Sequence, residues 1–304
     1  MTSPSLPENA SLMRRATYAS TGIAVLLIVM KTAAWLLTDS VSVMSSLLDS
    51  LLDVAASVVN LLAVRHALTP ADREHRFGHG KAEPLAGLAQ AAFVAGSALL
   101  LSLEAIHRFS SPQPISHGEI GIAVMVLSIV LTAGLVLYQR YVVRVTGSVA
   151  VGADSLHYRG DVLLNGSVIV SIILSTSLGW VVVDPLSGLL IAAYILYSAW
   201  MIVRASLDRL MDRELPDSER ARIREIALRH PHVTAVHDLR TRSSGLDVFI
   251  QIHLEMDGAM TLQRSHQIAD DVERDILTAF PQAEVMIHQD PAGIEEPRRT
   301  FAAS

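Results

Sequence analysis

The chain has 304 residues, of which 51% are hydrophobic and only 18% are charged, and its formal net charge is −6 at neutral pH. A soluble domain is usually about a quarter charged, so this composition favours a chain largely embedded in lipid, and the acidic balance argues against nucleic acid as a partner. The absence of cysteine excludes disulfides and thiolate metal sites, so any metal must be held by His, Asp, Glu or backbone oxygen.

Six apolar runs precede residue 205, and each is near or above the roughly 20 residues that cross a bilayer as a helix. They cover residues 17–37, 42–65, 84–106, 119–141, 149–174 and 180–203. Basic residues gather before the first run and in every second connector, whereas the alternate connectors carry only Arg108. By the positive-inside rule, both termini are expected in the cytoplasm. No small-residue cleavage site follows the first run, which is therefore expected to be a retained span.

After about residue 210 the pattern changes to that of a small soluble domain. A polar amphipathic helix follows Pro216, two alternating β-branched segments flank a turn at Gly245, and a second helix and a final strand complete the order αββαβ. This order predicts a cytoplasmic α+β domain of the ferredoxin or metallochaperone type, with its helices on one face of the sheet. The expected divisions are an N-terminal cytoplasmic segment at 1–16, a six-helix transmembrane domain at 17–209, the cytoplasmic domain at 210–291 and a disordered tail at 292–304.

Two of the apolar runs carry paired polar residues that lipid would make costly. Asp49 and Asp53 stand four residues apart in S-L-L-D-S-L-L-D, and His157 and Asp161 share that spacing in H-Y-R-G-D. Each pair faces one side of a helix, and ionisable groups inside a span are usually functional. One divalent cation held by all four would offset the carboxylate repulsion, and this ligand set suits Zn²⁺, with Fe²⁺, Mn²⁺, Co²⁺ and Cd²⁺ also compatible. The alternative is polar packing between helices, or protonated acids around a water pocket.

The motifs together resemble the cation diffusion facilitator family. The resemblance runs from about residue 12 to 291 and rests on D-S-L-L-D with H-Y-R-G-D, on the loop P-A-D-R-E-H-R-F-G-H-G-K-A-E, and on the tail segments H-D-L-R-T-R-S-S-G, F-I-Q-I-H-L-E-M and I-H-Q-D-P. It implies a homodimer of six-helix protomers in the bacterial inner membrane that exports Zn²⁺ in exchange for protons. It assigns Asp49, Asp53, His157 and Asp161 to the transport site. Within the family, Asp at residue 49 implies that Cd²⁺ is also accepted, and Fe²⁺ is a further expected substrate.

The same resemblance implies sites outside the membrane. A second site in the loop between the second and third runs would use Asp72, His75 and His79. A binuclear Zn²⁺ site in the cytoplasmic domain would place one ion on His237, His253 and Asp290 and the other on His266, His288 and Asp290, with Asp290 as the bridge. Lys81 and Asp212 match a family salt bridge at the membrane surface.

Three functions are compatible with a metal site inside a membrane. The favoured one is a metal and proton antiporter that works by alternating access, because imidazole and carboxylate bind either a proton or a metal ion. A membrane metal sensor or scaffold without flux is the second. An intramembrane metallohydrolase is the third, but the chain has no H-E-x-x-H motif and is not expected to be an enzyme. The expected partners are divalent metal ions, protons, membrane lipid and a second copy of the chain.

Overall fold

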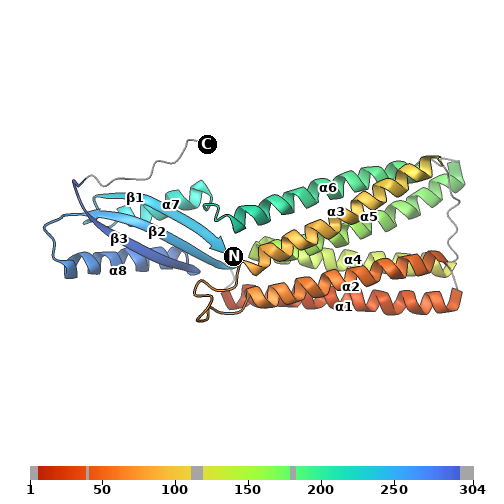
Figure 1. Cartoon of the computed structure of the whole chain (residues 1–304), viewed down its shortest axis with the longest axis horizontal. Helices are drawn as coiled ribbons and strands as arrows, with labels where there is room; N and C mark the ends of the chain where they lie inside the picture. The colour runs from red at the N-terminus through yellow and green to blue at the C-terminus, as the bar shows by residue number, and fades with distance from the viewer. Residues whose placement is uncertain (1–5, 39–40, 111–118, 179–182, 295–304) are drawn as a thin grey trace. The chain divides into compact units, whose positions relative to one another are not determined.

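The computed structural model describes residues 6–38, 41–110, 119–178 and 183–294, and it divides into two compact units, Met1–Leu210 and Met211–Ser304. The first unit consists, in its described part, of six long helices (Figure 1). They are α1 (Leu6–Thr38), α2 (Val41–Ala67), α3 (Ala82–Ser110), α4 (Glu119–Thr146), α5 (Val149–Leu178) and α6 (Val183–Leu210). Five of the six predicted apolar runs lie within these helices, and the sixth begins in residues outside the described part.

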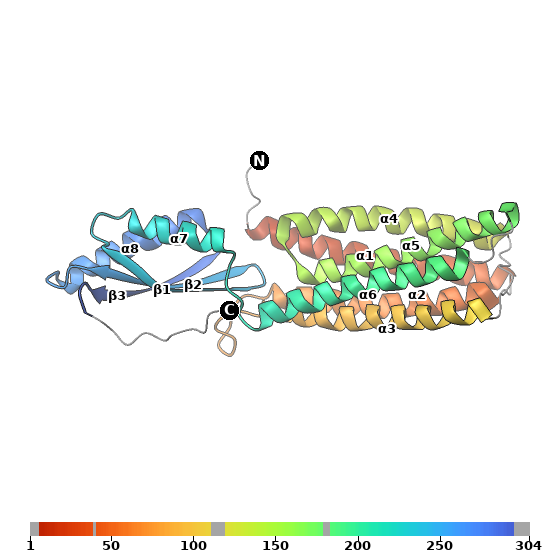
Figure 2. The same ribbon diagram turned by 90° about the horizontal axis from the view of Figure 1, so that it is seen from above.

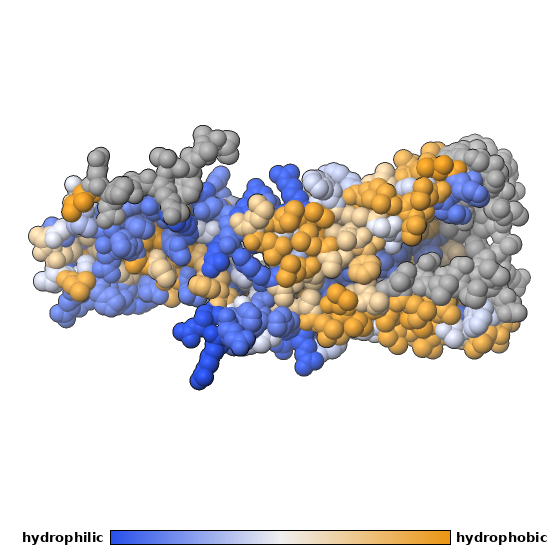
Figure 3. Space-filling model, viewed as in Figure 1, coloured by the Kyte–Doolittle hydropathy of each residue, from blue (hydrophilic) through white to orange (hydrophobic). Residues whose placement is uncertain are grey.

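The first unit has the surface of a membrane-embedded helical bundle. Among the described residues, α1, α3, α4 and α6 are long and apolar enough to cross a membrane. Large apolar side chains such as Leu100, Val130 and Leu190 are exposed on these helices, and the face shown in Figure 3 is largely hydrophobic over this unit. The two remaining helices, α2 and α5, are those that carry the paired polar residues. Residues 6–16, expected as a cytoplasmic segment, form the first turns of α1.

Small residues allow α3 and α6 to pack closely. Ala91 and Ala98 of α3 are buried in one cluster with Ala199 of α6. At Gly87 of α3, a side-chain Cβ would lie 2.7 Å from Ser206 Oγ and therefore could not be accommodated without movement. Lipid removes most of the hydrophobic drive for helix association, so close contact through small residues supplies the dispersion energy that holds such helices together.

The start of α5 is held by side chains from α3 and α6. Glu83 of α3 is buried, and its Oε1 accepts hydrogen bonds from the backbone N–H groups of Val149 (2.6 Å) and Ala150 (3.4 Å). Arg209 of α6 donates to the carbonyl oxygen of Gly147 at 2.8 Å. The first N–H groups of a helix have no partner within the helix and carry a partial positive charge, so a buried carboxylate stabilises this end.

The second unit has the predicted αββαβ order. Its elements are α7 (Asp217–Leu228), β1 (Ala235–Ser244), β2 (Asp247–Met256), α8 (Leu262–Ala279) and β3 (Ala283–Pro291). In the sheet, β2 is central, antiparallel to β1 and parallel to β3. Both helices cover one face of the sheet (Figure 2), and Ile250, Ile252 and Leu254 point from β2 into the core beneath them. The strand residues that alternate with these core residues therefore point to the other face of the sheet, which α7 and α8 leave open.

The salt bridge expected between Lys81 and Asp212 would link residues of the two units. Lys81, in the first unit, donates a hydrogen bond to the carbonyl oxygen of Leu210 at 3.5 Å. Asp212, in the second unit, lies 3.5 Å from Arg242 Nη1. The salt bridge therefore stays a prediction. Most of the predicted tail, residues 295–304, lies outside the described residues.

Candidate functional site

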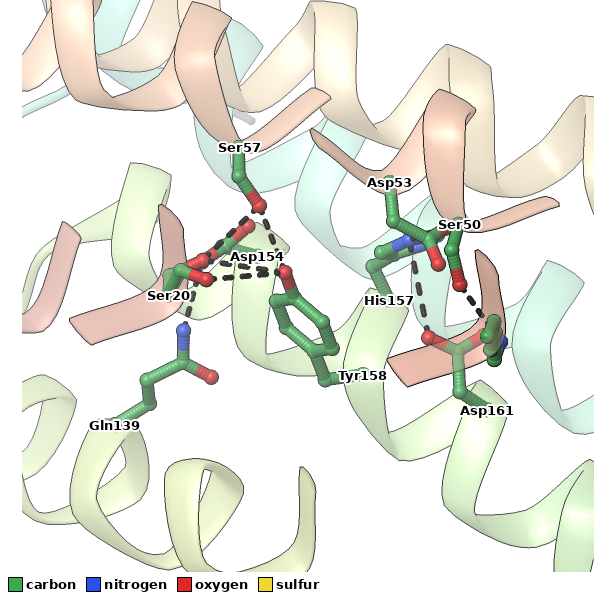
Figure 4. A network of polar contacts seen from close by, with 10 residues as sticks. Ser20, Ser50, Asp53, Ser57, Gln139, Asp154, His157, Tyr158 and Asp161 are labelled. Carbon is green, nitrogen blue, oxygen red and sulfur yellow. Dashed lines mark hydrogen bonds and ion pairs between the residues drawn. The ribbon is translucent and has the colours of Figure 1, made fainter. Parts of the chain in front are cut away.

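The membrane unit brings three of the four predicted transport ligands together. His157 Nε2 of α5 lies 2.8 Å from Asp53 Oδ1 of α2 and 3.9 Å from Asp161 Oδ2 one helical turn further along α5 (Figure 4). One potential ligand atom from each residue lies within 4.8 Å of the others, and all three residues are partly buried. Asp49 belongs to α2, but its side chain lies outside the described residues.

This arrangement can hold either a proton or a metal ion. When His157 carries a second proton, its positive charge offsets one of the two carboxylate charges, and Nε2 donates to Asp53. A divalent cation in the same place needs the neutral imidazole, so its arrival must release that proton. Imidazole nitrogen combined with carboxylate oxygen is a ligand set that suits Zn²⁺ and is less suited to Mg²⁺ or Ca²⁺, which prefer oxygen alone.

A lysine in α1 reaches the part of α2 that carries the transport ligands. Lys31 Nζ donates a hydrogen bond to the hydroxyl of Ser50 at 2.6 Å, and Ser50 is fully buried. Ser50 stands three residues before Asp53, so this ammonium group adds positive charge close to the carboxylates. The sequence indicated only a lone lysine in an apolar run, and no spacing rule connected it with α2.

A second polar cluster, also drawn in Figure 4, is formed by side chains of α1, α2, α4 and α5. Gln139 of α4 donates from Nε2 to Asp154 Oδ2 of α5 at 2.7 Å. The hydroxyl of Tyr158, also on α5, lies 2.8 Å from Ser57 Oγ of α2, which in turn lies 3.1 Å from Ser20 Oγ of α1. All five side chains are buried, so their hydrogen bonds replace those that water would provide and fix α5 against its neighbours.

The loop between α2 and α3 brings its three predicted ligands into one group. Asp72 Oδ1 lies 3.3 Å from His75 Nδ1, and Asp72 Oδ2 lies 3.4 Å from His79 Nε2. The backbone N–H of His75 donates to Asp72 at 2.6 Å, and this hydrogen bond holds the pKa of Asp72 below its ordinary value. The ring of His66, at the end of α2, contacts that of His79 with 4.6 Å between centroids, and this extra imidazole was missed in the sequence.

The open face of the cytoplasmic sheet gathers three imidazoles around one buried carboxylate. Asp290 Oδ2 lies 3.0 Å from His237 Nε2 and 2.9 Å from His253 Nδ1. Its other oxygen, Oδ1, lies 3.0 Å from His288 Nε2. The strand register explains this meeting, because residues 237, 253 and 288 are paired across β1, β2 and β3. Both oxygens of Asp290 thus face nitrogen ligands, as a bridging carboxylate requires.

Two further residues of this unit differ from the sequence expectation. Glu255, which was not predicted, places Oε1 2.9 Å from His237 Nδ1, within ion-pair distance but without the alignment of a hydrogen bond. His266 lies on α8, on the helical side of the sheet, where its Nε2 is 3.7 Å from Asp270. The metal-ligand group found among the described residues contains His237, His253 and Asp290 and does not include His266. Its place in the second ion's ligand set stays a prediction.

Comparison with known proteins places both units among cation efflux proteins. A model of the cation efflux transmembrane domain matches residues 17–211, and a model of the cation efflux protein, cytoplasmic domain, matches residues 215–292. The cation-efflux pump FieF of Serratia proteamaculans is 48% identical over 288 residues, which is 95% of this chain and 96% of the relative. The FieF pump of Escherichia fergusonii is 49% identical over 283 residues, with 93% and 94% of the two chains covered.

Two of the solved structures that match this chain each correspond to about a quarter of it. The zinc form of the putative zinc transporter CzrB is 34% identical, covers 28% of this chain and 99% of its own, and has a TM-score of 0.26. A variant of the MamM CTD is 25% identical, covers 25% of this chain and 95% of its own, and has a TM-score of 0.24.

Proposed function

Because the chain belongs to the cation diffusion facilitator family of metal efflux transporters, we propose that it exports cytoplasmic Zn²⁺ in exchange for protons. Family members are transporters and not enzymes, so the metallohydrolase hypothesis is set aside. The observation that carries the proposal is the group formed by Asp53, His157 and Asp161 between α2 and α5. Asp49 is the proposed fourth ligand, one helical turn before Asp53.

The exchange follows from competition for the same atoms. A proton on His157 satisfies Asp53 when the site holds no metal, and Zn²⁺ displaces it on entry. Each proton that moves down a gradient of one pH unit supplies about 1.4 kcal/mol to drive the metal the other way. Cd²⁺ and Fe²⁺ are proposed as further substrates, because carboxylate and imidazole ligands do not select Zn²⁺ alone.

The orientation and assembly complete the proposal. The arginine-rich connectors support an orientation in which both termini lie in the cytoplasm of a bacterial cell and the transmembrane unit lies in the inner membrane. Asp72, His75 and His79 form a second metal site, and His237, His253, His266, His288 and Asp290 form a binuclear Zn²⁺ site of structural type. A second copy of the chain is the proposed partner, and the open sheet face that carries Asp290 leaves Met286 63% exposed.

Flux through sealed vesicles tests the transport proposal. Purified protein in liposomes that contain a zinc-sensitive dye should take up Zn²⁺ when a proton gradient is imposed, and collapsing the gradient with an ionophore should slow the uptake. Asp161→Asn keeps the shape of the side chain but removes a charged ligand, so its uptake should fall to the level of empty liposomes. The matched control is Asp275→Asn, an exposed position on α8. Binding of Zn²⁺ by the wild type without uptake would favour the sensor or scaffold function. Undiminished uptake by Asp161→Asn would show that Asp161 is not a ligand of the transport site.

A further inference from the structure

The N-terminal half of α1 and the last turns of α2 line a half-open polar cavity that the transport site does not use. Its volume is about 390 Å³, within the range of small-ligand sites in proteins. Its polar lining comes from Arg14, Thr17 and Tyr18 on the α1 side and from Arg65 and Thr69 on the α2 side. The helices run in opposite directions, because Ser20 of α1 contacts Ser57 of α2 whereas Lys31, later in α1, contacts Ser50, earlier in α2; these two stretches therefore meet at one end of the bundle.

The cavity has a marked excess of positive charge. The guanidinium groups of Arg14 and Arg65 both line it, and neither has an ion-pair or hydrogen-bond partner within the described ranges. The two hydroxyls of Thr17 and Thr69 donate to the backbone oxygens of these same arginines, at 2.9 and 3.3 Å. Tyr18 is 57% exposed, and its hydroxyl likewise has no partner in that part of the chain. Several donors therefore face a space that holds no acidic side chain in its lining.

An anion with several acceptor oxygens fits this lining. Two guanidinium groups around one space repel each other unless an anion neutralises them, and arginine matches phosphate oxygens with parallel hydrogen bonds. Phosphate is the chemistry shared by a free phosphate ion and a phospholipid headgroup. The surroundings distinguish the two, because Val25, Leu26 and Val29 leave exposed apolar side chains further along α1, where acyl chains would lie.

We propose that this cavity binds the phosphate of an anionic phospholipid at the cytoplasmic face of the membrane. Arg14 precedes the first apolar run and Arg65 ends the second, which puts both guanidinium groups at headgroup depth in the proposed orientation. Basic pockets between transmembrane helices on the cytoplasmic side bind acidic headgroups in this way. The phosphate bridges α1 to α2 about three helical turns from Asp53, so it stabilises the helix that carries half of the transport site.

Thermal unfolding of the full-length protein in dodecyl maltoside tests the lipid site. Phosphatidylglycerol should raise the melting temperature of the wild type, whereas phosphatidylcholine and inorganic phosphate should have little effect. In the double variant Arg14→Gln, Arg65→Gln, the apparent affinity for phosphatidylglycerol should fall about 30-fold, because each basic residue near an acidic headgroup contributes a factor of about 5.4. The matched control is Arg140→Gln, Arg144→Gln, which removes two exposed arginines at the end of α4.

Native mass spectrometry supplies a readout that does not depend on the variant's own stability. Wild type and control should retain phosphatidylglycerol adducts that the cavity variant loses. Equal retention by all three proteins, or an equal thermal shift with phosphatidylcholine, would overturn the proposal. If inorganic phosphate alone produced the whole shift and the cavity variant abolished it, the ligand would be free phosphate and the lipid assignment would be wrong. Zinc uptake by the cavity variant in liposomes separates this result from a failure of the transport proposal, since the transport ligands are intact.

Discussion

At the scale of single residues, the cytoplasmic site shows how one carboxylate can organise several imidazoles. Asp290 is only 5% exposed, and each of its oxygens faces at least one ring nitrogen of His237, His253 or His288. In that arrangement the orientation of each ring decides which nitrogen is available to a metal. On the far side of the His237 ring, Glu255 Oε1 lies 2.9 Å from Nδ1, although the ring and the carboxylate are not aligned for a hydrogen bond. A turn of the ring that lets Nδ1–H donate to this carboxylate would fix the tautomer that leaves Nε2 free as a ligand.

We therefore expect Glu255→Gln to weaken Zn²⁺ binding at the cytoplasmic site by about 10- to 100-fold, the usual effect of losing such an outer partner. Zinc titration of the fragment from residue 211 onward, followed by calorimetry, measures the change. Glu284→Gln is the matched control, because Glu284 is an exposed glutamate on the same open face of the sheet. An affinity for Glu255→Gln indistinguishable from that of the control would show that Glu255 does not orient a ligand.

A different carboxylate of this unit makes stability depend on pH. Burial, and then repulsion from Glu284, raises the pKa of Asp247 above its ordinary value of 3.8. The folded pKa is higher than the unfolded one, so the ionised form is disfavoured by folding. The resulting loss of stability is absent below the unfolded pKa, develops as pH rises through the folded pKa and is complete at neutral pH.

Asp247→Asn should consequently raise the melting temperature of the fragment at pH 7, and the gain over wild type should shrink as the pH is lowered through the folded pKa. Thermal unfolding at a series of pH values measures both melting curves. Asp275→Asn, an exposed position on α8, controls for the loss of one negative charge. A gain for Asp247→Asn that did not change with pH would contradict the raised pKa of Asp247 as its cause.

At the scale of elements, α5 shows what spacing alone can predict. The i, i+4 spacing of His157 and Asp161 places both on one helix face, and the structure brings them to Asp53 as the pattern indicated. The same helix is held at its start by Glu83 and further along by Tyr158, and neither was predicted. A buried glutamate and a lone tyrosine acquire their roles from helices distant in the sequence, so local periodicity contains no signal for them.

In the sheet of the second unit, too, the elements could be predicted from the sequence, but the contacts between their side chains could not. Alternation in the segments around His253 and His288 was enough to predict strands, and the structure confirms the αββαβ fold. The meeting of those histidines depends on register, since a shift of one residue would turn a side chain to the helical face. His66 contacts the loop ligand His79 only because the loop folds back onto the end of α2. Such contacts follow from the tertiary path of the chain, which no local pattern describes.

Packing of α3 against its neighbours provides a test at this scale. In Gly87→Ala the new Cβ would lie 2.7 Å from Ser206 Oγ and 2.9 Å from Val149 Cγ1, so these two side chains, or the helices that carry them, must shift. We expect a loss of about 1–3 kcal/mol in the free energy of unfolding, typical of overpacking. Thermal unfolding in detergent measures it, with Gly96→Ala as the matched control on the same helix, because nothing lies within 4 Å of a Cβ there. Equal stability of the two variants would show that α3 can move without cost.

At the scale of the whole molecule, the chain combines two units with different sources of stability. The membrane unit relies on small-residue packing and buried hydrogen bonds, whereas the second unit has a core of its own in which β2 meets α7 and α8. Its proposed metal ligands lie on the opposite, open face of the sheet and add nothing to that core. A metal ion bound there would therefore add stability that depends on the concentration of free metal around this unit.

The bridging carboxylate makes this dependence testable. In Asp290→Ala both proposed ions lose a ligand at once, because each oxygen of Asp290 faces a different set of imidazoles. With free Zn²⁺ at about 100 times the dissociation constant, one occupied site adds about 2.7 kcal/mol to the free energy of unfolding. For a fragment of this size that corresponds to a rise on the order of 10 °C in melting temperature. The fragment from residue 211 onward should show such a rise with Zn²⁺, and Asp290→Ala should lose most of it while Asp275→Ala keeps it. Equal zinc-induced shifts in Asp290→Ala and wild type would rule out Asp290 as the bridge.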